Sequence, residues 1–257
     1  MSLRVALAQM EVATGRPDQN FQQATEMAER AASAGARLFL LPELWLTGYD
    51  LEQAGQHAQE LPAWLERWSA LARQHRMAMA GSVLAADPSG RPANTAFLLS
   101  AEGEVVGCYR KIHLFGPLGE IRHLVPGKES PCFALSWGRV ALAICYDLRF
   151  PELFRRYIDQ GAEIVLLPSQ WPLRRLEHWQ ILLRARAIEN QCYLLGCNSV
   201  GPGPGETLFA GHSAAIGPWG QVLVEGGEKA DLLLAEIDLE EVRRVRESFP
   251  VLRDRRL

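Results

Sequence analysis

Three side chains that can act together on an amide carbonyl each follow a short apolar run in this sequence. Glu43 follows LFLLP, Lys111 follows VVGCYR and Cys145 follows VALAI. A cysteine nucleophile needs a base that takes the thiol proton and later protonates the leaving amine. The oxyanion that forms needs positive charge or N–H donors. Glutamate, lysine and the backbone N–H of Tyr146 match these needs, which predicts acyl-transfer chemistry at Cys145.

The position of these residues after apolar runs is a second indication. In open α/β sheets, reactive groups gather beyond the carboxyl ends of the strands. Pro151 and Glu152 suit the first turn of a helix. We therefore expect Cys145 at a strand-to-helix elbow, where a helix N-terminus lowers the pKa of a thiol and exposes its sulfur. Taken singly, Cys145 also fits a buried structural cysteine, Glu43 a helix cap and Lys111 a surface lysine; their combination favours catalysis.

Strand and helix patterns alternate along most of the chain. Runs such as VALAI and IVLLP are apolar at successive positions, which is typical of strands covered on both faces. The alternation predicts an α/β protein. Strands are expected at residues 3–9, 37–41, 77–84, 95–100, 105–109, 140–144, 164–167, 193–197, 213–216, 221–224 and 232–237, and helices at roughly 18–34, 60–75, 150–160, 175–190 and 239–247.

A weak internal repeat indicates how these elements are related. RVALA occurs at residues 4–8 and again at 139–143, and AGARLFLLPELW (34–45) aligns with QGAEIVLLPSQW (160–171). Two copies of one strand–helix–strand unit explain the repeat, and chance similarity between apolar strands is the alternative. We expect residues 1–257 to form a single domain with internal pseudo-symmetry.

The composition excludes several classes of protein. Hydrophobic residues make up 48% and charged residues 22%, as in folded globular proteins, and the net charge of −3 provides no basic field for nucleic acid or an anionic membrane. The arginine-rich C-terminal arm, about residues 238–257, is interleaved with acidic side chains and is interpreted as a solvated helix face and tail. We expect the N-terminus to be neither a signal peptide nor a membrane anchor, and no apolar run approaches the ~18 residues of a membrane span. We expect a cytoplasmic protein.

Cysteine and histidine spacing indicates neither a disulfide framework nor a metal site. The five cysteines form no CxxC pair, and the six histidines include no HxH or HExxH. Disulfides are rare in cytosolic chains, and structural zinc sites use closely spaced ligands. We therefore expect no metal and no other cofactor.

The segments around the three candidates resemble the signature segments of the nitrilase superfamily of carbon–nitrogen hydrolases. They are LPELWLTGY, YRKIHLF and ICYDLRFPELFR, in the superfamily's order, and the resemblance runs nearly end to end through HWQILLRARAIENQCY and GHSAAIGPWGQVL. It implies a four-layer αββα sandwich with two stacked mixed sheets, assembled as a homodimer or a larger homo-oligomer. It also implies Cys145 as nucleophile, Glu43 as general base and Lys111 as the cation that stabilises the oxyanion.

The resemblance implies roles for neighbouring residues too. Many members carry a second glutamate shortly before a PG dipeptide, and GEIRHLVPG places Glu120 there. We assign Glu120 to positioning the substrate or the deacylating water. Asp147, Arg149 and Glu152 are interpreted as an ion-pair and capping cluster that supports the nucleophile's elbow.

The substrate class is suggested by PSQWPLRRLEHW (168–179), which resembles the small omega-amidase branch and its bacterial relatives. Those enzymes hydrolyse the terminal amide of 2-oxo acid amides such as 2-oxoglutaramate. A substrate carboxylate calls for an arginine that binds it through two hydrogen bonds. Arg175 is the candidate, with Phe115 and Trp171 as pocket walls; a helix-start or subunit-contact role is the alternative for Arg175. Because Trp171 corresponds to Trp45 in the repeat, both are expected to approach one cleft.

The expected function is thus an amidase that hydrolyses a non-peptide C–N bond of a small amide through a cysteine thioester. Within the superfamily, a deaminated-glutathione amidase or an N-carbamoyl hydrolase is the alternative. Outside it, Cys145 is a redox sensor whose function survives loss of Glu43, or the chain is a binding protein. The expected partners are a small amide and further copies of the chain, with no nucleic acid and no membrane.

Overall fold

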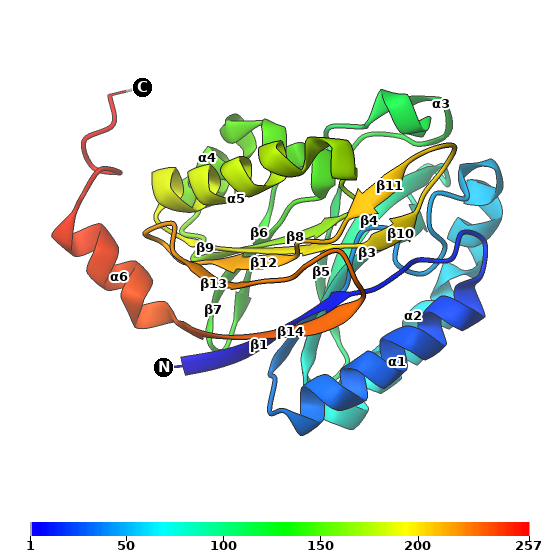
Figure 1. Ribbon diagram of the computed structural model, residues 1–257, viewed down its shortest axis with the longest axis horizontal. Helices are drawn as coiled ribbons and strands as arrows, with labels where there is room; N and C mark the ends of the chain where they lie inside the picture. Colours follow the sequence, from blue (N-terminus) through cyan, green and yellow to red (C-terminus); the bar gives the residue numbers. More distant parts are fainter. Residues whose placement is uncertain (1, 257) are drawn as a thin grey trace.

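Two six-stranded sheets lie face to face in the computed structural model, which describes residues 2–256 (Figure 1). The strands are β1 (Ser2–Gln9), β2 (Leu38–Leu40), β3 (Ala78–Ala86), β4 (Pro92–Leu99), β5 (Val105–Arg110), β6 (Cys132–Leu135), β7 (Gly138–Leu142), β8 (Ile164–Ser169), β9 (Tyr193–Asn198), β10 (Val200–Pro202), β11 (Leu208–Ala210), β12 (Ala214–Ile216), β13 (Val222–Glu225) and β14 (Asp231–Asp238). The helices are α1 (Pro17–Ser33), α2 (Ala54–His75), α3 (Glu120–His123), α4 (Pro151–Asp159), α5 (Leu176–Asn190) and α6 (Leu239–Ser248).

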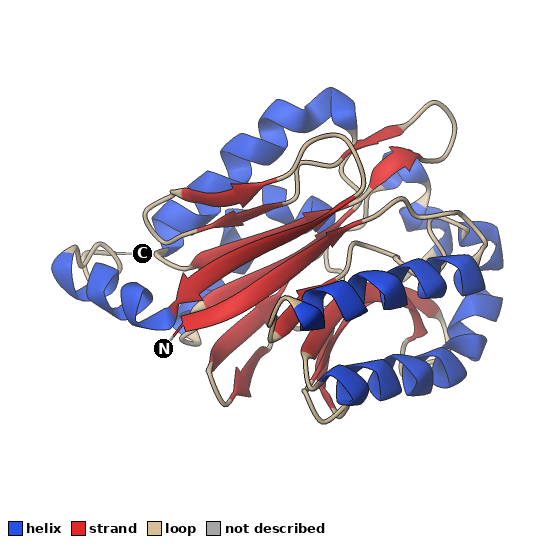
Figure 2. Cartoon of the chain, turned by 60° about the horizontal axis from the view of Figure 1, so that its bottom comes forward, coloured by secondary structure: helices blue, strands red, loops and turns tan. Residues whose placement is uncertain are grey.

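The two sheets are built on the same plan. The first has the order β14-β1-β2-β3-β4-β5 and the second β6-β7-β8-β9-β12-β13. In each sheet, three neighbouring strands (β1, β2 and β3, or β7, β8 and β9) are parallel and the flanking strands are antiparallel. Helices α1 and α2 cover the first sheet, and α4 and α5 cover the second (Figures 1 and 2). This is the four-layer αββα sandwich that the resemblance to the nitrilase superfamily implies.

The repeated segments occupy equivalent places in the two sheets. Val5 of β1 pairs with Leu38 of β2, and Val140 of β7 pairs with Ile164 of β8. These are the positions that the sequence alignment equates. Each strand pair and its crossover helix, α1 or α4, is therefore one copy of the same unit, and the expected pseudo-symmetry extends to the strand register.

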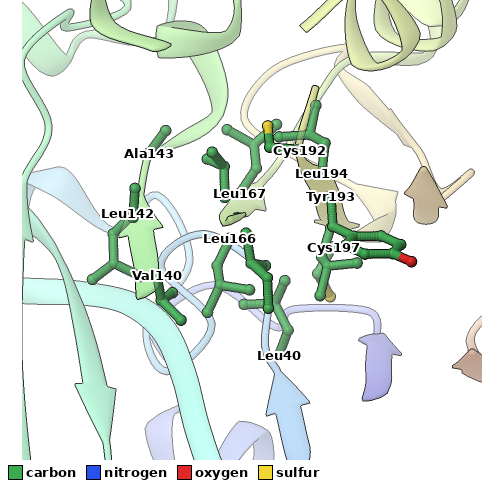
Figure 3. Close-up of a cluster of buried hydrophobic side chains, with 14 of the residues drawn as sticks. Leu40, Val140, Leu142, Ala143, Leu166, Leu167, Cys192, Tyr193, Leu194 and Cys197 are labelled. Atoms are coloured by element: carbon green, nitrogen blue, oxygen red, sulfur yellow. The ribbon is translucent and has the colours of Figure 1, made fainter. Parts of the chain in front are cut away.

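Alternate residues of a strand divide between two apolar cores. Val5 and Leu7 of β1 pack in the core between the sheets, whereas Ala6 and Ala8 pack against the helices that cover the first sheet. Leu40 of β2 lies in the core between the sheets, among side chains of β7, β8 and β9 (Figure 3). Each fully buried leucine or valine contributes about 1.5–3 kcal/mol relative to exposure. This packing fixes one sheet against the other, and with it the loops that follow β2 and β7.

The structure differs from the expected elements in three short strands, in the short helix α3, which the sequence does not predict, and in α2. The sequence does not predict β6, β10 and β11, because strands of so few residues carry little pattern. Helix α2 begins at Ala54 rather than near residue 60, and Pro62 lies inside it. Ala54, Ala58 and Leu61 are buried at helical spacing. Burial of this face stabilises the helix enough to include Pro62, although a proline removes one backbone hydrogen-bond donor.

The C-terminal arm leaves the sandwich after β14 and continues as α6 (Figure 1). Asp238 caps α6 by accepting a hydrogen bond from the N–H of Glu240, and exposed ion pairs follow on its outer face, as expected. Arg246 departs from the expectation of a solvated helix. Its guanidinium donates to the carbonyls of Ala162 and Gln191, which ties the arm to the segments before β8 and β9. No helix within residues 2–256 has both the length and the apolar character needed to cross a membrane.

Candidate active site

Lys111, Glu43 and Glu120 converge in the interior of the protein. Lys111 directly follows β5, and Glu43 lies three residues beyond β2. The Nζ atom of Lys111 is 2.7 Å from Oε1 of Glu43 and 2.8 Å from Oε1 of Glu120, and all three side chains are fully buried. The structure thus unites three of the residues that the sequence singles out, from segments far apart in the chain.

Glu43 is held by residues of both sheets. Its Oε2 accepts a hydrogen bond from the backbone N–H of Gln170 at 3.0 Å, and the side-chain amide of Gln170 donates to the Glu43 carbonyl at 2.6 Å. Ser169, whose carbonyl accepts from the Glu43 N–H, is the counterpart of Glu43 in the internal repeat. The equivalent strand ends of the two units therefore meet at the site, and each steadies the other.

Asn94 on β4 joins the cluster, although nothing in the sequence pattern singles it out. Its Nδ2 is 2.8 Å from Oε1 of Glu43 and 3.2 Å from Oε1 of Glu120. Asn94 thus donates to the same two oxygens as Lys111, which fixes the spacing of the two carboxylates. The only signal is a polar residue in a buried strand, and such residues are too common to identify a site by themselves.

Glu120 begins the short helix α3 and closes the loop that follows β5. Its Oε2 accepts a hydrogen bond from the backbone N–H of Phe115 at 2.5 Å. Burial raises the pKa of Glu120, the positive charge of Lys111 opposes that rise, and the charge of Glu43 adds to it. The ionisation of Glu120 therefore depends on Lys111, which couples the two side chains.

The charge of Lys111 is secured by its neighbours. Burial alone lowers the pKa of the ammonium, but the charges of Glu120 and Glu43 outweigh burial and hold the pKa above its ordinary value. Lys111 is therefore a cation throughout the pH range in which enzymes work. A fixed buried cation is suited to stabilising an oxyanion, not to acting as a base.

Cys145 lies at a sharp turn close after β7. Its φ is 45°, a left-handed conformation that residues other than glycine rarely adopt. Such strain is concentrated at functional sites. Cys145 begins a 3-10 turn, Cys145–Arg149, and α4 starts only at Pro151. The expected elbow is present, but the residue does not lie at the N-terminus of an α-helix.

The Cys145 thiol is buried, and its surroundings favour the neutral form over the thiolate. Only 5% of the residue is exposed. Burial raises the pKa of the thiol well above its ordinary value, and the negative charge of Glu43 raises it further, whereas Lys111 and the N–H of Gln170 lower it. The expectation of an exposed sulfur with a lowered pKa is therefore wrong, because the loss of solvation outweighs the nearby positive charge.

Asp147 connects the Cys145 turn with the segment after β5. One of its oxygens accepts from the N–H of Ile144 at 2.9 Å and from the hydroxyl of Tyr109 at 2.8 Å. The other accepts from the N–H of His113 at 3.1 Å and lies 2.7 Å from His113 Nδ1. Asp147 thus has the supporting role that the sequence suggests, and it joins the lysine and cysteine segments.

A small, partly open pocket adjoins Cys145. Phe115, Trp171 and Arg175, the three expected pocket residues, all line it, together with Tyr146. The N–H of Tyr146 lies in the first turn of the 3-10 segment, where backbone N–H groups have no acceptor within the helix. The pocket therefore combines aromatic walls, a guanidinium and, near the thiol, the backbone N–H of Tyr146, which has no acceptor within its helix.

Trp45 does not reach this pocket, contrary to expectation. It is buried between the first sheet and the helices that cover it, and its ring lies 5.2 Å from that of Trp68. Trp171, its counterpart in the repeat, lines the pocket and donates its indole N–H to the carbonyl of Arg175. The two tryptophans occupy equivalent positions in the repeat. Side chains of α1 and α2 surround Trp45, however, so that it lies away from the pocket.

Arg149 also lines the pocket and is not part of the expected ion-pair cluster. Its guanidinium lies 4.7 Å from the ring of Trp171 and 3.2 Å from Nδ1 of His178, while Glu152 is exposed at the start of α4. Among the described residues, neither Arg149 nor Arg175 has a carboxylate within ion-pair distance. Partial burial and the positive charge of Arg175 both lower the pKa of Arg149. Two like charges thus share one pocket beside the thiol.

The cluster contains the parts that acyl transfer requires: a thiol, an adjacent carboxylate, a fixed cation and a pocket for a small molecule. Within the part of the chain that the structure describes, no three His, Cys, Asp or Glu side chains gather as metal ligands would.

The chain is similar to several known proteins. The family model described as Carbon-nitrogen hydrolase matches residues 4–247. The 2-oxoglutaramate amidase of Bacillus subtilis (strain 168) is 39% identical over 99% of this chain and 98% of its own length. The omega-amidase NIT2 of Homo sapiens is 30% identical over 99% of this chain and 95% of its own length.

A solved structure extends the similarity to three dimensions. A variant of the amidase from Nesterenkonia sp. AN1, 32% identical, superposes with a TM-score of 0.86 over 98% of this chain and 96% of that chain. That protein carries the acetamide moiety of fluoroacetamide covalently bound at its active-site cysteine.

Proposed function

The chain belongs to the carbon-nitrogen hydrolase family, and from that premise we propose that it is an amidase for small carboxylate-bearing 2-oxo amides, with 2-oxoglutaramate as the favoured substrate. The relatives support this activity, since one is a 2-oxoglutaramate amidase and another an omega-amidase. The observation that carries the substrate class is the pair of guanidiniums, Arg149 and Arg175. They line the Cys145 pocket and have no carboxylate partner among residues 2–256.

Acylation starts from the neutral thiol. As Cys145 attacks the amide carbonyl carbon, Glu43 takes its proton, so the sulfur never holds a buried charge unaided. The carbonyl oxygen becomes an oxyanion that Lys111 and the N–H of Tyr146 stabilise. Glu43 passes the proton to the leaving nitrogen, ammonia departs, and a thioester remains on Cys145.

Hydrolysis of the thioester uses the same groups in reverse. Glu43 takes a proton from a water whose oxygen attacks the thioester carbonyl. The carbon–sulfur bond breaks, Glu43 returns the proton to the sulfur of Cys145, and the acid leaves. Glu120 exchanges no proton in this scheme; through Lys111 and Asn94 it keeps Glu43 in place for both steps.

Substrate recognition rests on the two arginines. A guanidinium binds a carboxylate through two parallel hydrogen bonds, and two neighbouring guanidiniums repel each other until an anion joins them. Arg149 lies over Trp171 and Arg175 lies 5.6 Å from the ring of Phe115, so aromatic walls hold both cations without neutralising them. A 2-oxo acid amide carries its carboxylate and oxo oxygen at one end and its amide at the other, which matches a cationic pocket beside a thiol.

Product release from a panel of amides tests the proposed activity, measured as ammonia for the primary amides and carbamoyl compounds and as free cysteinylglycine for deaminated glutathione. The panel pairs 2-oxoglutaramate and 2-oxosuccinamate with deaminated glutathione, N-carbamoyl amino acids and the uncharged butyramide. The 2-oxo acid amides should have the highest kcat/KM, and Cys145→Ala should release no ammonia from any of them. Rapid turnover of a carbamoyl compound with slow turnover of every 2-oxo amide would overturn the substrate assignment.

Arginine variants test the recognition step. Arg149→Gln and Arg175→Gln should each raise KM for 2-oxoglutaramate by about tenfold or more, because a hydrogen bond to a charged group contributes about 1.5–3 kcal/mol. Neither should affect butyramide. Arg174→Gln is the matched control, since Arg174 is exposed beside Arg175 and does not line this pocket. Equal losses for charged and uncharged amides would contradict carboxylate recognition.

A redox-sensor role for Cys145 has no support in the site. Sensor thiols are accessible and have a lowered pKa, whereas burial raises the pKa of this thiol. Loss of amide hydrolysis in Glu43→Gln separates the two functions, because a sensor does not need that carboxylate.

We also propose that the protein works in the cytoplasm as a homodimer or a larger homo-oligomer. All five cysteines are unpaired, in keeping with a reducing compartment. Trp219 and Phe249 stack on each other with more than half of each side chain exposed, as in a surface that another subunit covers. Light scattering should give a mass above the 28.6 kDa of one chain, and Trp219→Lys should lower it. A monomeric mass for the unmodified protein would contradict assembly.

A further inference from the structure

Tyr49 lies at the edge of the catalytic cluster, although none of the steps above uses it. The chain turns sharply after Glu43. Leu44 has a φ of 45° and Gly48 a φ of 61°, and the N–H of Gly48 donates to the Leu44 carbonyl at 2.7 Å. This tight turn brings Tyr49 back toward the carboxylate that it follows by six residues.

Apolar neighbours enclose the ring of Tyr49. It stacks on Phe209 with 6.3 Å between ring centroids and belongs to a buried cluster with Leu124. Leu114 and Leu118 pack against that cluster. These three leucines come just before and just after Glu120 in the chain, so the ring is held against the loop that carries this second carboxylate.

The hydroxyl of Tyr49 has no hydrogen-bond partner among the described residues, although it is buried. Burial raises the pKa of the phenol, and the charges of Glu43, Glu120 and Cys145 raise it further, together with a contact to the Glu43 carboxylate that falls short of a full hydrogen bond. Leaving a buried hydroxyl without a full hydrogen bond lowers the stability of the fold. Such an uncompensated cost is typical of a group that binds something during function.

Asn94 provides a second unfilled position in the same cluster. Its Nδ2 donates to Glu43 and Glu120, but its Oδ1 is buried without a partner among residues 2–256. Buried polar groups that lack hydrogen-bond partners within the protein commonly bind an ordered water. The catalytic cluster therefore offers more hydrogen-bonding capacity than its own side chains use.

We infer that the Tyr49 hydroxyl holds the water that hydrolyses the thioester, an inference that rests on the proposed thioester mechanism. One O–H of the water donates to Glu43 and the other to the oxygen of Tyr49, which directs a lone pair at the thioester carbonyl. The water oxygen bonds to the carbonyl carbon, the carbon–sulfur bond breaks, and Glu43 carries one proton to the sulfur of Cys145. The second hydrogen leaves with the acid, so Tyr49 neither gains nor loses a proton.

Tyr49→Phe tests this role because it keeps the ring and removes only the hydroxyl. We expect kcat for 2-oxoglutaramate to fall by about tenfold to a hundredfold, with KM no higher than in the unmodified enzyme. The thioester should accumulate, seen as an acylated Cys145 in the mass spectrum of acid-quenched enzyme and as a burst of ammonia in the first turnover. Hydroxylamine, which attacks the thioester without this water site, should accelerate the variant more than the unmodified enzyme.

Thermal unfolding distinguishes a water-binding hydroxyl from a structural one. Tyr49→Phe should unfold at the same or a higher temperature, because it removes an unpaired buried group. Tyr193→Phe is the matched control: its hydroxyl hydrogen-bonds to the carbonyl of Asp238 and to the carboxylate of Glu241 at the C-terminal arm. That variant should lose stability and keep its kcat.

Two results would overturn the inference. One is a Tyr49→Phe enzyme with unchanged kcat and no accumulated thioester; the other is a joint loss of activity and thermal stability. Both leave the proposed function intact, since that proposal fails only if the unmodified enzyme does not release ammonia from the 2-oxo amides.

Discussion

The ammonium of Lys111 lies 2.7 Å from the carboxylate of Glu43, a residue 68 positions earlier in the chain. Both side chains are fully excluded from solvent. Burying charges costs several kcal/mol per ion, and pairing offsets that cost only when the remaining hydrogen bonds are also made. Asn94 and Gln170 make them for Glu43. A buried pair of this kind is weak evidence for stability, so its position beside a thiol points to chemistry.

Lys111→Met should abolish activity and lower the free energy of unfolding by about 3–5 kcal/mol, because two buried carboxylates then lack a cation. Urea unfolding measures this loss. Adding Glu120→Gln to the same protein removes one of the unpaired charges, and should restore part of the stability but none of the activity. An unchanged urea midpoint for Lys111→Met would show that the cluster is not held as described.

Glu43→Gln separates two effects of one carboxylate on Cys145. Because the negative charge of Glu43 raises the pKa of the thiol, its removal should lower that pKa, although burial keeps it above the ordinary value. The pH profile of Cys145 alkylation by iodoacetamide should shift to lower pH, while amide hydrolysis falls by about 10²–10⁴ from loss of the base. Cys145→Ala corrects for the other cysteines. A profile shifted to higher pH would be incompatible with this electrostatic account.

Asp147→Asn should loosen the turn that presents the nucleophile. The carboxylate accepts from four donors, including the N–H groups of Ile144 and His113. An amide replaces one accepting oxygen by a donor and leaves buried donors unpaired, which costs about 1–3 kcal/mol each. We expect a lower melting temperature and a kcat reduced by about tenfold or more, because Cys145 is no longer held at its strained φ. Wild-type kcat in a destabilised variant would mean that the turn keeps its shape without Asp147.

Gly127→Ala should displace the backbone of Lys111, which Gly127 contacts. The N–H of Gly127 donates to the Lys111 carbonyl at 2.8 Å, and a Cβ at this position would lie 2.1 Å from the carbonyl oxygen of Arg110. The chain that carries Lys111 must therefore move, and we expect kcat to fall by about tenfold or more. Gly55→Ala is the control, since nothing lies within 4 Å of its added methyl in α2 and alanine favours a helix. Equal kinetics for the two variants would show that this contact does not position Lys111.

The parts of the site that the sequence predicts are those that depend on local order. Glu43, Lys111 and Cys145 each follow an apolar run, and the rule that strand ends carry reactive groups is enough to bring them together. The repeat likewise predicts the pairing of β1 with β2 and of β7 with β8, because register is set by the side-chain period of the strands. Asn94 escapes prediction, since only the neighbouring strands show that its amide faces two carboxylates.

The expectations that the structure contradicts concern properties that depend on the residues packed around a side chain. The helix expected after Cys145 begins too late to act on the thiol, and burial raises the pKa that the elbow was expected to lower. Trp45 and Trp171 occupy equivalent strand positions, yet only Trp171 reaches the pocket. Arg149, expected in an ion-pair cluster, shares that pocket instead. In each case the neighbours come from elements distant in the chain.

Short segments of the sequence are enough to predict the α/β alternation, the duplicated unit and the three chemically matched residues at strand ends, because periodicity and residue type are local properties. The packing of the two sheets was needed to establish that burial raises the pKa of the thiol, that Asn94 and Gln170 hold Glu43, and that Arg149 joins Arg175 beside Cys145. Solvation and electrostatic energy depend on every atom within a few ångströms, and packing one sheet against the other is what supplies those atoms.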